Sequence, residues 1–163
     1  MSAERIDAFI GIGSNLEQPK QQVESAIVAI AGIPECQIVK VSSLYRSAPV
    51  GHSQQPDLVN AVAMVQTSLS AKALLNHLLA LENLAGRVRR ERWGPRVLDL
   101  DLLMYGARVR SSGLPLLPHP RMQQRAFVLV PLLEVAADII IPGCGSAADC
   151  LRNLGPQHIE RIQ

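Results

Sequence analysis

The sequence predicts an α+β fold, in which a ferredoxin-like antiparallel sheet has helices packed on it and is extended by extra C-terminal elements. Three observations lead to this expectation. The predicted elements follow the order strand, helix, strand, strand, helix, strand, which is the split βαβ pattern. Both predicted helices have apolar residues at helical spacing. The chain has 163 residues, 48% of them hydrophobic, so we expect a single domain over residues 1–163 with a sizeable core.

The chain begins with a predicted strand, turn and helix. Residues 6–12 form an apolar run typical of a strand, and Gly11-Ile12-Gly13-Ser14-Asn15 should form a tight turn at its end. This segment resembles part of a phosphate-binding loop, but it lacks the later glycine and the Lys-Ser/Thr pair, so we interpret it as a turn. A helix is expected over 19–31, because Pro19 suits its start and Gly32 follows its end.

Two strands, a loop and a second helix are predicted next. Residues 37–47 alternate enough to predict one strand, residues 48–56 are a polar loop, and residues 58–68 predict a third strand. Ser70 is placed to cap a helix that should end at Gly86.

The remaining elements are predicted from shorter patterns. Residues 97–105 are rich in apolar residues and should form the fourth strand. Residues 126–137 predict a helix in spite of Pro131, residues 139–141 a short strand, and residues 146–154 a last helix. Since no internal repeat or linker interrupts the chain, these elements are expected to add to the same sheet.

Charge and cysteine content argue against several classes of protein. The formal net charge is +2 and the pI is about 8.6, which is too mild for bulk nucleic-acid binding. Cys36, Cys144 and Cys150 are an odd number without a CxxC pair, so they indicate neither a disulfide framework nor a zinc site. The first seven residues lack the apolar core of a signal peptide, and no apolar run of about 18 residues predicts a membrane span. We therefore expect a cytoplasmic protein.

Residues 86–101 carry the clearest chemical signal. Five arginines and the only tryptophan, Trp93, lead directly into Asp99 and Asp101. Side chains two residues apart on a strand share a face, so the two carboxylates should stand side by side. Mg²⁺ suits such a pair, because it is held by few carboxylates and completes its shell with water and phosphate oxygens. Arginine forks match phosphate oxygens, so the segment predicts a site for a magnesium-bound polyphosphate.

Each of these features also has an ordinary structural explanation. An Asp-x-Asp pair is more often a solvated surface pair, but a strand that is apolar on both faces favours a bound cation here. The arginines could form a solvated basic loop, or a loop between Gly86 and Gly94 that closes over phosphates. Trp93 could anchor the core or stack on a planar ligand. His119, between two prolines, could be structural or could contact phosphate.

Taken in order, several motifs resemble the 6-hydroxymethyl-7,8-dihydropterin pyrophosphokinase family along nearly the whole chain. The family signature is the stretch Arg92-Trp93-Gly94-Pro95-Arg96-Val97-Leu98-Asp99-Leu100-Asp101-Leu102-Leu103, which is highly specific. The other matching segments are Ile10-Gly11-Ile12-Gly13-Ser14-Asn15-Leu16, Ser42-Ser43-Leu44-Tyr45-Arg46, Gln55-Pro56-Asp57 with Asn60, and Pro118-His119-Pro120-Arg121 with Arg125-Ala126-Phe127. The resemblance implies transfer of a pyrophosphoryl group from ATP to the pterin hydroxymethyl oxygen, with release of AMP, by a monomer that uses two Mg²⁺ ions.

The resemblance also implies roles for individual residues. Asp99 and Asp101 would bind the metal ions, and Arg87 and Arg96 would steady the transferring phosphates. The ATP site would be lined by Glu82, Arg89, Arg92, Leu102, His119 and Arg125. The pterin would be surrounded by Ser47, Ala48, Val50, Asn60, Trp93 and Phe127. Residues 47–56 and 86–96 would be two loops that close over the substrates.

Three leucines depart from the family pattern. Leu58 stands where an aromatic residue can stack on the pterin, Leu79 where a glutamine can touch ATP, and Leu114 where an arginine can reach the phosphates. Phe127 is therefore the expected ring partner.

Two other functions fit part of the pattern. A ferredoxin-like sheet with a basic loop is also the frame of an RNA-binding module, but only 3% of the residues are aromatic and the aromatic sheet motif is absent. A metal-dependent phosphohydrolase could use the same acids and arginines, and only its products would tell it apart. We expect no nucleic-acid or membrane partner.

Overall fold

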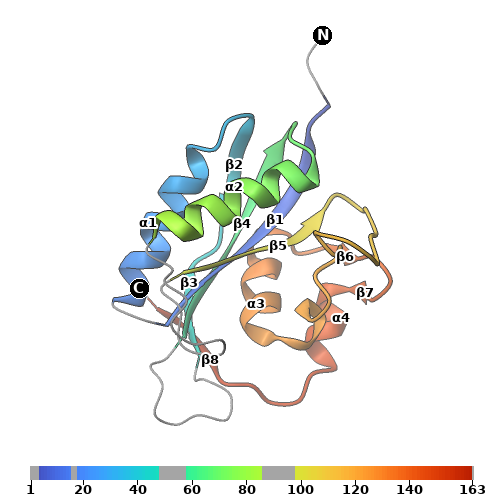
Figure 1. The fold of residues 1–163 in the computed structure, drawn as a ribbon. Helices are drawn as coiled ribbons and strands as arrows, with labels where there is room; N and C mark the ends of the chain where they lie inside the picture. The colour runs from blue at the N-terminus through green and yellow to red at the C-terminus, as the bar shows by residue number, and fades with distance from the viewer. Residues whose placement is uncertain (1–3, 16–17, 48–57, 86–97, 163) are drawn as a thin grey trace.

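The computed structural model of the chain describes residues 4–15, 18–47, 58–85 and 98–162 (Figure 1). Within these residues the central sheet has six strands, and its order is β5-β1-β4-β3-β8, with β2 also paired to β4. All of these strand pairs are antiparallel. The strands are β1 (Ile6–Ser14), β2 (Cys36–Val41), β3 (Leu44–Ser47), β4 (Leu58–Thr67), β5 (Asp99–Tyr105) and β8 (Ile159–Ile162).

The helices cover both faces of this sheet (Figure 1). They are α1 (Pro19–Ala31), α2 (Ala71–Leu84), α3 (Ala126–Val135) and α4 (Ala147–Arg152). Side chains of α1 and α2 join one buried cluster with Ile10 and Ala61, while those of α3 and α4 join another with Phe9 and Val62. Adjacent residues of β1 and β4 therefore enter different cores, which explains why the strand sequences are apolar without a clear alternation.

The predicted order of elements is confirmed, but the strand predicted over 37–47 is two strands. β2 ends at Val41 and β3 begins at Leu44. At the break, the Ser42 backbone N–H donates to Val62 O at 2.9 Å, and the Ser42 hydroxyl oxygen accepts from Val62 N at 2.9 Å. A side-chain oxygen thus replaces a backbone carbonyl in the ladder, and the same hydroxyl donates to Ser43 O at 2.7 Å.

The tight turn predicted at Gly11-Ile12-Gly13-Ser14-Asn15 is wrong, because β1 continues to Ser14. The glycines serve close packing within the sheet. A Cβ atom at Gly13 would lie 2.6 Å from the Asn60 Oδ1 atom, and one at Gly11 would lie 3.4 Å from a Leu103 methyl carbon. Glycine in a strand interior often marks such an approach.

The helix predictions hold with small shifts at the ends. α1 begins at Pro19, and the Ser70 hydroxyl caps α2 by accepting from Ala73 N at 3.1 Å. α2 ends at Leu84, and Gly86 lies outside the described residues. α3 contains Pro131 and ends two residues earlier than predicted, while α4 is shorter at both ends.

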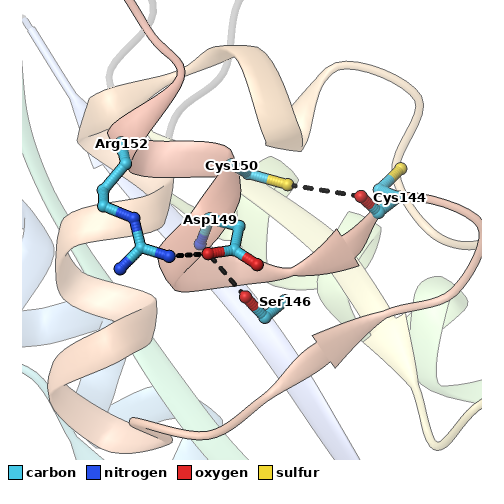
Figure 2. A network of polar contacts seen from close by, with 5 residues as sticks. All are labelled: Cys144, Ser146, Asp149, Cys150 and Arg152. Atoms are coloured by element: carbon cyan, nitrogen blue, oxygen red, sulfur yellow. Dashed lines mark hydrogen bonds and ion pairs between the residues drawn. The ribbon is translucent and has the colours of Figure 1, made fainter.

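The C-terminal part adds a small hairpin and the strand β8. β6 (Ile140–Ile141) lies where residues 139–141 predict a strand, and it pairs with β7 (Gly145–Ser146), which was not predicted. The expectation that the predicted strand adds to the central sheet is wrong, because β6 and β7 form a separate two-stranded sheet, whereas β8 does join the central one. Figure 2 shows how this hairpin meets α4: the Ser146 hydroxyl accepts from Asp149 N at 3.1 Å, and the Cys150 thiol donates to Cys144 O at 3.8 Å. Asp149 also forms an ion pair with Arg152 (Figure 2). The three cysteines are free thiols.

No helix among the described residues combines the length and the apolar character needed to cross a membrane.

Replacing Ser42 by alanine should destabilise the fold by about 1–3 kcal/mol, because the buried Val62 N–H would lose its acceptor. Urea unfolding measures this change. The matched control is Ser68→Ala, whose hydroxyl makes an exposed contact of 3.3 Å with Glu35 and should cost less than about 0.5 kcal/mol. Equal unfolding midpoints for Ser42→Ala and the wild type would contradict the role given to Ser42.

Candidate functional site

One row of cross-strand neighbours forms the floor of the candidate site. In the register of the sheet, Tyr45 of β3 faces Asn60 of β4, Asn60 faces Gly13 of β1, and Gly13 faces Asp99 of β5. Directly opposed residues project to the same face of an antiparallel sheet. The row therefore brings residues from four strands, distant in sequence, to one face.

This face is the one that α3 covers. Val62 and Leu103 belong to the core on the α3 side, and they lie two positions along their strands from Asn60 and Asp101. Because side chains alternate along a strand, Asn60 and Asp101 point to the same side as these core residues. We call the row of Tyr45, Asn60, Gly13 and Asp99 the polar row. It borders an apolar core.

Asp99 and Asp101 lie on β5 as the sequence predicts, and both are half-buried. They face Gly13 and Gly11 respectively, so the neighbouring strand has no side chain to fill the space beside them. Two residues along a strand span about 7 Å. The described residues contain no cluster of three or more metal-ligating side chains. A pair of carboxylates fits Mg²⁺, which usually takes its other ligands from water and substrate phosphates.

His119 and Arg125 come from the segment that follows β5. The His119 backbone N–H donates to Leu103 O at 2.8 Å, which holds this segment against the edge strand. Burial lowers the pKa of His119, the Asp101 carboxylate raises it, and the positive charges of Arg125 and Arg121 lower it again; the net shift is downward. Burial and the two arginines thus disfavour the protonated form of His119. These interactions place His119, Arg125 and Asp101 within electrostatic range of one another.

Phe127 lies two residues after Arg125, at the start of α3. It is the second residue of α3, it is half-buried against the α3-side core, and the Arg125 guanidinium lies 5.5 Å from its ring centroid. This is a cation–π distance. The predicted ATP residue and the predicted pterin residue therefore contact each other.

Ser47 and Asn60 carry buried polar atoms that lack partners. They are 5% and 8% exposed, and neither Ser47 Oγ nor Asn60 Nδ2 has a hydrogen-bond partner in the described part of the chain. Ser47 lies two positions from Tyr45 on β3, so it shares the face of the polar row. An unsatisfied buried polar atom typically costs about 1–3 kcal/mol. Two of them on one face fit a site that is completed by a polar ligand.

Glu82 and Leu102 do not join this face. Glu82 of α2 is 4% exposed, and its Oε2 atom accepts from Leu100 N at 2.8 Å, so it anchors β5. The Leu102 side chain is 3% exposed in the core on the α1 and α2 side. Contact between Leu102 and a nucleotide would involve the backbone at the open edge of β5 instead of the side chain.

Seven predicted site residues lie outside the described residues. They are Ala48, Val50, Arg87, Arg89, Arg92, Trp93 and Arg96. The two predicted closing loops, 47–56 and 86–96, fall there almost entirely. Of the leucines that depart from the family pattern, Leu58 faces Ser47 in the sheet, and Leu79 and Leu114 are exposed.

A hollow of about 700 Å³ lies elsewhere, at the start of α1. It is lined by Gln18, Pro19, Lys20, Gln21, Glu24, Arg46 and Val59. No predicted site residue lines it, and Val59 belongs to the core on the α1 and α2 side. We therefore assign the site by the polar row and not by this hollow.

Gln157 is a residue near the site that the sequence did not indicate. Its side-chain oxygen accepts from Ala126 N at 2.9 Å, and its side-chain nitrogen donates to Gln124 O at 3.2 Å. It thus holds the backbone on both sides of Arg125, at the N-terminus of α3. No local pattern predicts such a contact, because the partners are more than 30 residues apart in the chain.

Comparison with known proteins points in the same direction as the motifs. The family model described as 7,8-dihydro-6-hydroxymethylpterin-pyrophosphokinase matches residues 9–137. A Haemophilus influenzae protein named 2-amino-4-hydroxy-6-hydroxymethyldihydropteridine pyrophosphokinase is 46% identical over 137 residues, covering 84% of this chain and 86% of the relative. A Pseudomonas aeruginosa protein of the same name is 42% identical over 154 residues, covering 94% and 95%.

A solved structure supports the fold. The crystal structure of wild-type Plasmodium falciparum HPPK-DHPS with pteroate aligns with a TM-score of 0.71 at 10% identity. The alignment covers 93% of this chain and 43% of that one. At this identity the likeness concerns the fold alone.

Replacing Gln157 by alanine should destabilise the N-terminal turn of α3, because Ala126 N would lose its acceptor. We expect a loss of about 1 kcal/mol and faster amide hydrogen exchange at residues 126–128, measured by mass spectrometry. His158→Ala, which changes the exposed neighbouring residue, should leave exchange unchanged. Unchanged exchange in Gln157→Ala would show that the contact does not hold this turn.

Proposed function

This chain belongs to the 7,8-dihydro-6-hydroxymethylpterin-pyrophosphokinase family and so is a diphosphotransferase of folate biosynthesis. We propose below which residues bind the metal ions, ATP and the pterin. ATP is the co-substrate, and the transfer to 6-hydroxymethyl-7,8-dihydropterin gives AMP and the pterin diphosphate. The observation that carries the division of roles is the polar row, because it joins the acidic pair to the buried polar atoms of Ser47 and Asn60 on one face.

Asp99 and Asp101 are proposed to hold two Mg²⁺ ions. When bound, the ions would neutralise the triphosphate and favour ionisation of the attacking hydroxyl. The chain itself supplies two carboxylates on one face and, in His119, a neighbour whose pKa is lowered chiefly by burial. Asp99 lies in the same row as Asn60, so it is the carboxylate that we expect to assist in taking the hydroxyl proton.

The phosphates of ATP are proposed to lie between the acidic pair and the arginines. Arg125 is one cation that the described residues contribute, and Arg87 and Arg96 are the proposed partners of the transferring phosphates. Charge that develops on the leaving phosphate needs fixed cations, and these typically change rates by about 10²–10⁵-fold. The other proposed ATP residues are Arg89, Arg92 and His119. Leu102 would contribute only its backbone, and Glu82 would act indirectly by holding the backbone of β5 at Leu100.

The pterin is proposed to lie over the row between Asn60 and α3. Asn60 and Asp99 are two strands apart, which corresponds to roughly 10 Å, enough for a bicyclic ring to reach from one to the other. The Asn60 side-chain nitrogen can donate to the ring, and the Ser47 hydroxyl can donate or accept. Phe127 would stack on one ring face, and Ala48, Val50 and Trp93 are the remaining proposed contacts.

We also propose that the protein acts as a monomer in the cytoplasm, as one domain over residues 1–163, without a nucleic-acid or membrane partner. The mild net charge of +2 supports the lack of a nucleic-acid partner. The three free thiols are compatible with a reducing compartment.

The reaction products test the function directly. With ATP, Mg²⁺ and the pterin, the protein should form AMP and pterin diphosphate in equal amounts, measured by chromatography. Asp101→Asn should reduce this turnover at least about 10²-fold, because one carboxylate ligand loses its charge. Asp138→Asn, at an exposed position, should retain wild-type turnover. Release of phosphate or pyrophosphate without modified pterin would instead support a phosphohydrolase.

Gly13→Ala should weaken pterin binding, because its Cβ would lie 2.6 Å from Asn60 Oδ1 and force the amide to turn away. We expect a rise of about tenfold in KM for the pterin, equivalent to about 1.4 kcal/mol, with little loss of stability, since the end of a side chain can rotate. Gly11→Ala is the matched control for pterin KM, because the three atoms nearest to its Cβ all belong to Leu103, at 3.4–3.5 Å. Equal KM values for the two variants would argue against the role of Asn60.

A further inference from the structure

Glu134 of α3 accepts three hydrogen bonds, one from Tyr45 of β3 and two from Ser43, the residue just before β3. Its Oε1 atom accepts from the Tyr45 hydroxyl at 2.5 Å. Its Oε2 atom accepts from the Ser43 backbone N–H and from the Ser43 hydroxyl, both at 2.9 Å. A single carboxylate therefore joins a helix to a strand that lies about 90 residues earlier in the chain.

The two joined elements carry the proposed pterin residues. Tyr45 faces Asn60 in the sheet and lies two positions from Ser47 on β3. On α3, Glu134 is seven residues after Phe127, so the two side chains lie two turns apart on the same helix face. The contact between Glu134 and Tyr45 thus connects the helix that carries Phe127 with the strand that carries Ser47.

α3 needs such external support because of Pro131. Proline has no N–H to donate to the carbonyl four residues earlier, which is that of Phe127. The helix is instead held from outside at both ends, by Gln157 at Ala126 and by Glu134 at β3. The first turn, with Phe127, is therefore positioned by contacts with other parts of the chain.

The charge of Glu134 strengthens the contact. Burial raises its pKa, but the hydrogen bonds from Tyr45 and Ser43 and the charge of Arg161 outweigh this, so the pKa of Glu134 is lowered overall. Burial, the hydrogen bond to Glu134 and the charge of Glu134 raise the pKa of Tyr45 to about 12, with Arg161 opposing. An ionised acceptor and a neutral phenol donor form a charge-assisted hydrogen bond.

We propose that Glu134 is a positioning residue for the pterin side of the site, which acts through Tyr45 and Ser43 and sets the spacing between α3 and the sheet. This inference rests on the proposed function. Glu134 contacts neither the acidic pair nor His119 in any described interaction, and Gln157 separately holds the backbone on both sides of Arg125. The effect of Glu134 should therefore fall mainly on the pterin.

The test compares Glu134→Gln with Glu160→Gln. Glu160 is a matched control, because it is an exposed carboxylate on β8 that pairs with Arg46 at 3.8 Å. We expect Glu134→Gln to raise KM for the pterin about tenfold, while the Kd of a non-hydrolysable ATP analogue stays within about twofold. Glu160→Gln should change neither value.

A second variant separates positioning from loss of folding. Tyr45→Phe removes only the contact with Oε1, so it should raise KM for the pterin in the same direction with a smaller loss of thermal stability. In the double variant the two effects should not add, because both changes break one contact. Unchanged pterin KM in both single variants, or equal losses of pterin and ATP-analogue binding that follow the loss of Tm, would overturn the proposal.

The pH dependence of stability gives an independent signature. The groups that face Glu134 are Tyr45 of β3, Ser43 just before β3, and Arg161 of β8. A carboxylate with a lowered folded-state pKa stabilises the fold above its unfolded pKa of 4.5, and this stabilisation is lost as the pH falls through the lower value. A phenol with a raised pKa stabilises below about pH 10 and loses this effect as the pH rises through about 12.

The stability difference between the wild type and Glu134→Gln, measured by urea unfolding, should therefore be constant between about pH 5 and pH 9 and shrink below about pH 4.5. A difference that is independent of pH down to pH 3 would overturn the charge-assisted contact. The wild-type product assay keeps the two proposals apart. If the wild type forms pterin diphosphate while Glu134→Gln keeps its pterin KM, only the role of Glu134 fails; if the wild type forms none, the proposed function fails.

Discussion

The register of β1 between β4 and β5 is the constraint on which the site depends. Gly13 stands between Asn60 and Asp99, and Gly11 stands opposite Asp101. A slip of one residue would turn every side chain of β1 to the other face. Ile12 would then project into the polar floor, and the glycines would leave gaps in the core on the α1 and α2 side. Ile10 and Ile12 are fully or nearly fully buried in that core. Their packing therefore holds the register of β1, and this register places Gly11 and Gly13 on the opposite face, beside Asp101 and Asp99.

The chemistry of this floor follows from its position at the border of an apolar core. Two carboxylates about 7 Å apart repel each other by about 2 kcal/mol at an effective dielectric constant of 20. The segment that follows β5 is positively charged near the site, because Arg125 and Arg121 lie close enough to His119 to lower its pKa. Under the proposed function these arginines would attract polyphosphate, and a dication between the acids would remove the repulsion.

The sequence predicts those parts of the fold and the site that depend on local patterns. The order of strands and helices, the cap at Ser70 and the shared face of Asp99 and Asp101 all follow from spacing within one element. The break at Ser42, the extension of β1 through Gly13 and the strand β8 depend on contacts between distant segments, so periodicity could not reveal them. Glu134 and Gln157 were missed for the same reason: each is an ordinary polar residue whose partners lie in another part of the chain.

The supporting contacts also reach beyond the part of the chain that carries the family match. The match ends at residue 137, whereas β8 and Gln157 come later in the chain. β8 pairs along the whole of β3, from Leu44 to Ser47, and so covers the edge of the strand that carries Tyr45 and Ser47. Unpaired strand edges are less constrained. The proposed site residues therefore lie within the family match, while residues 157–162 contact β3 and the backbone on both sides of Arg125.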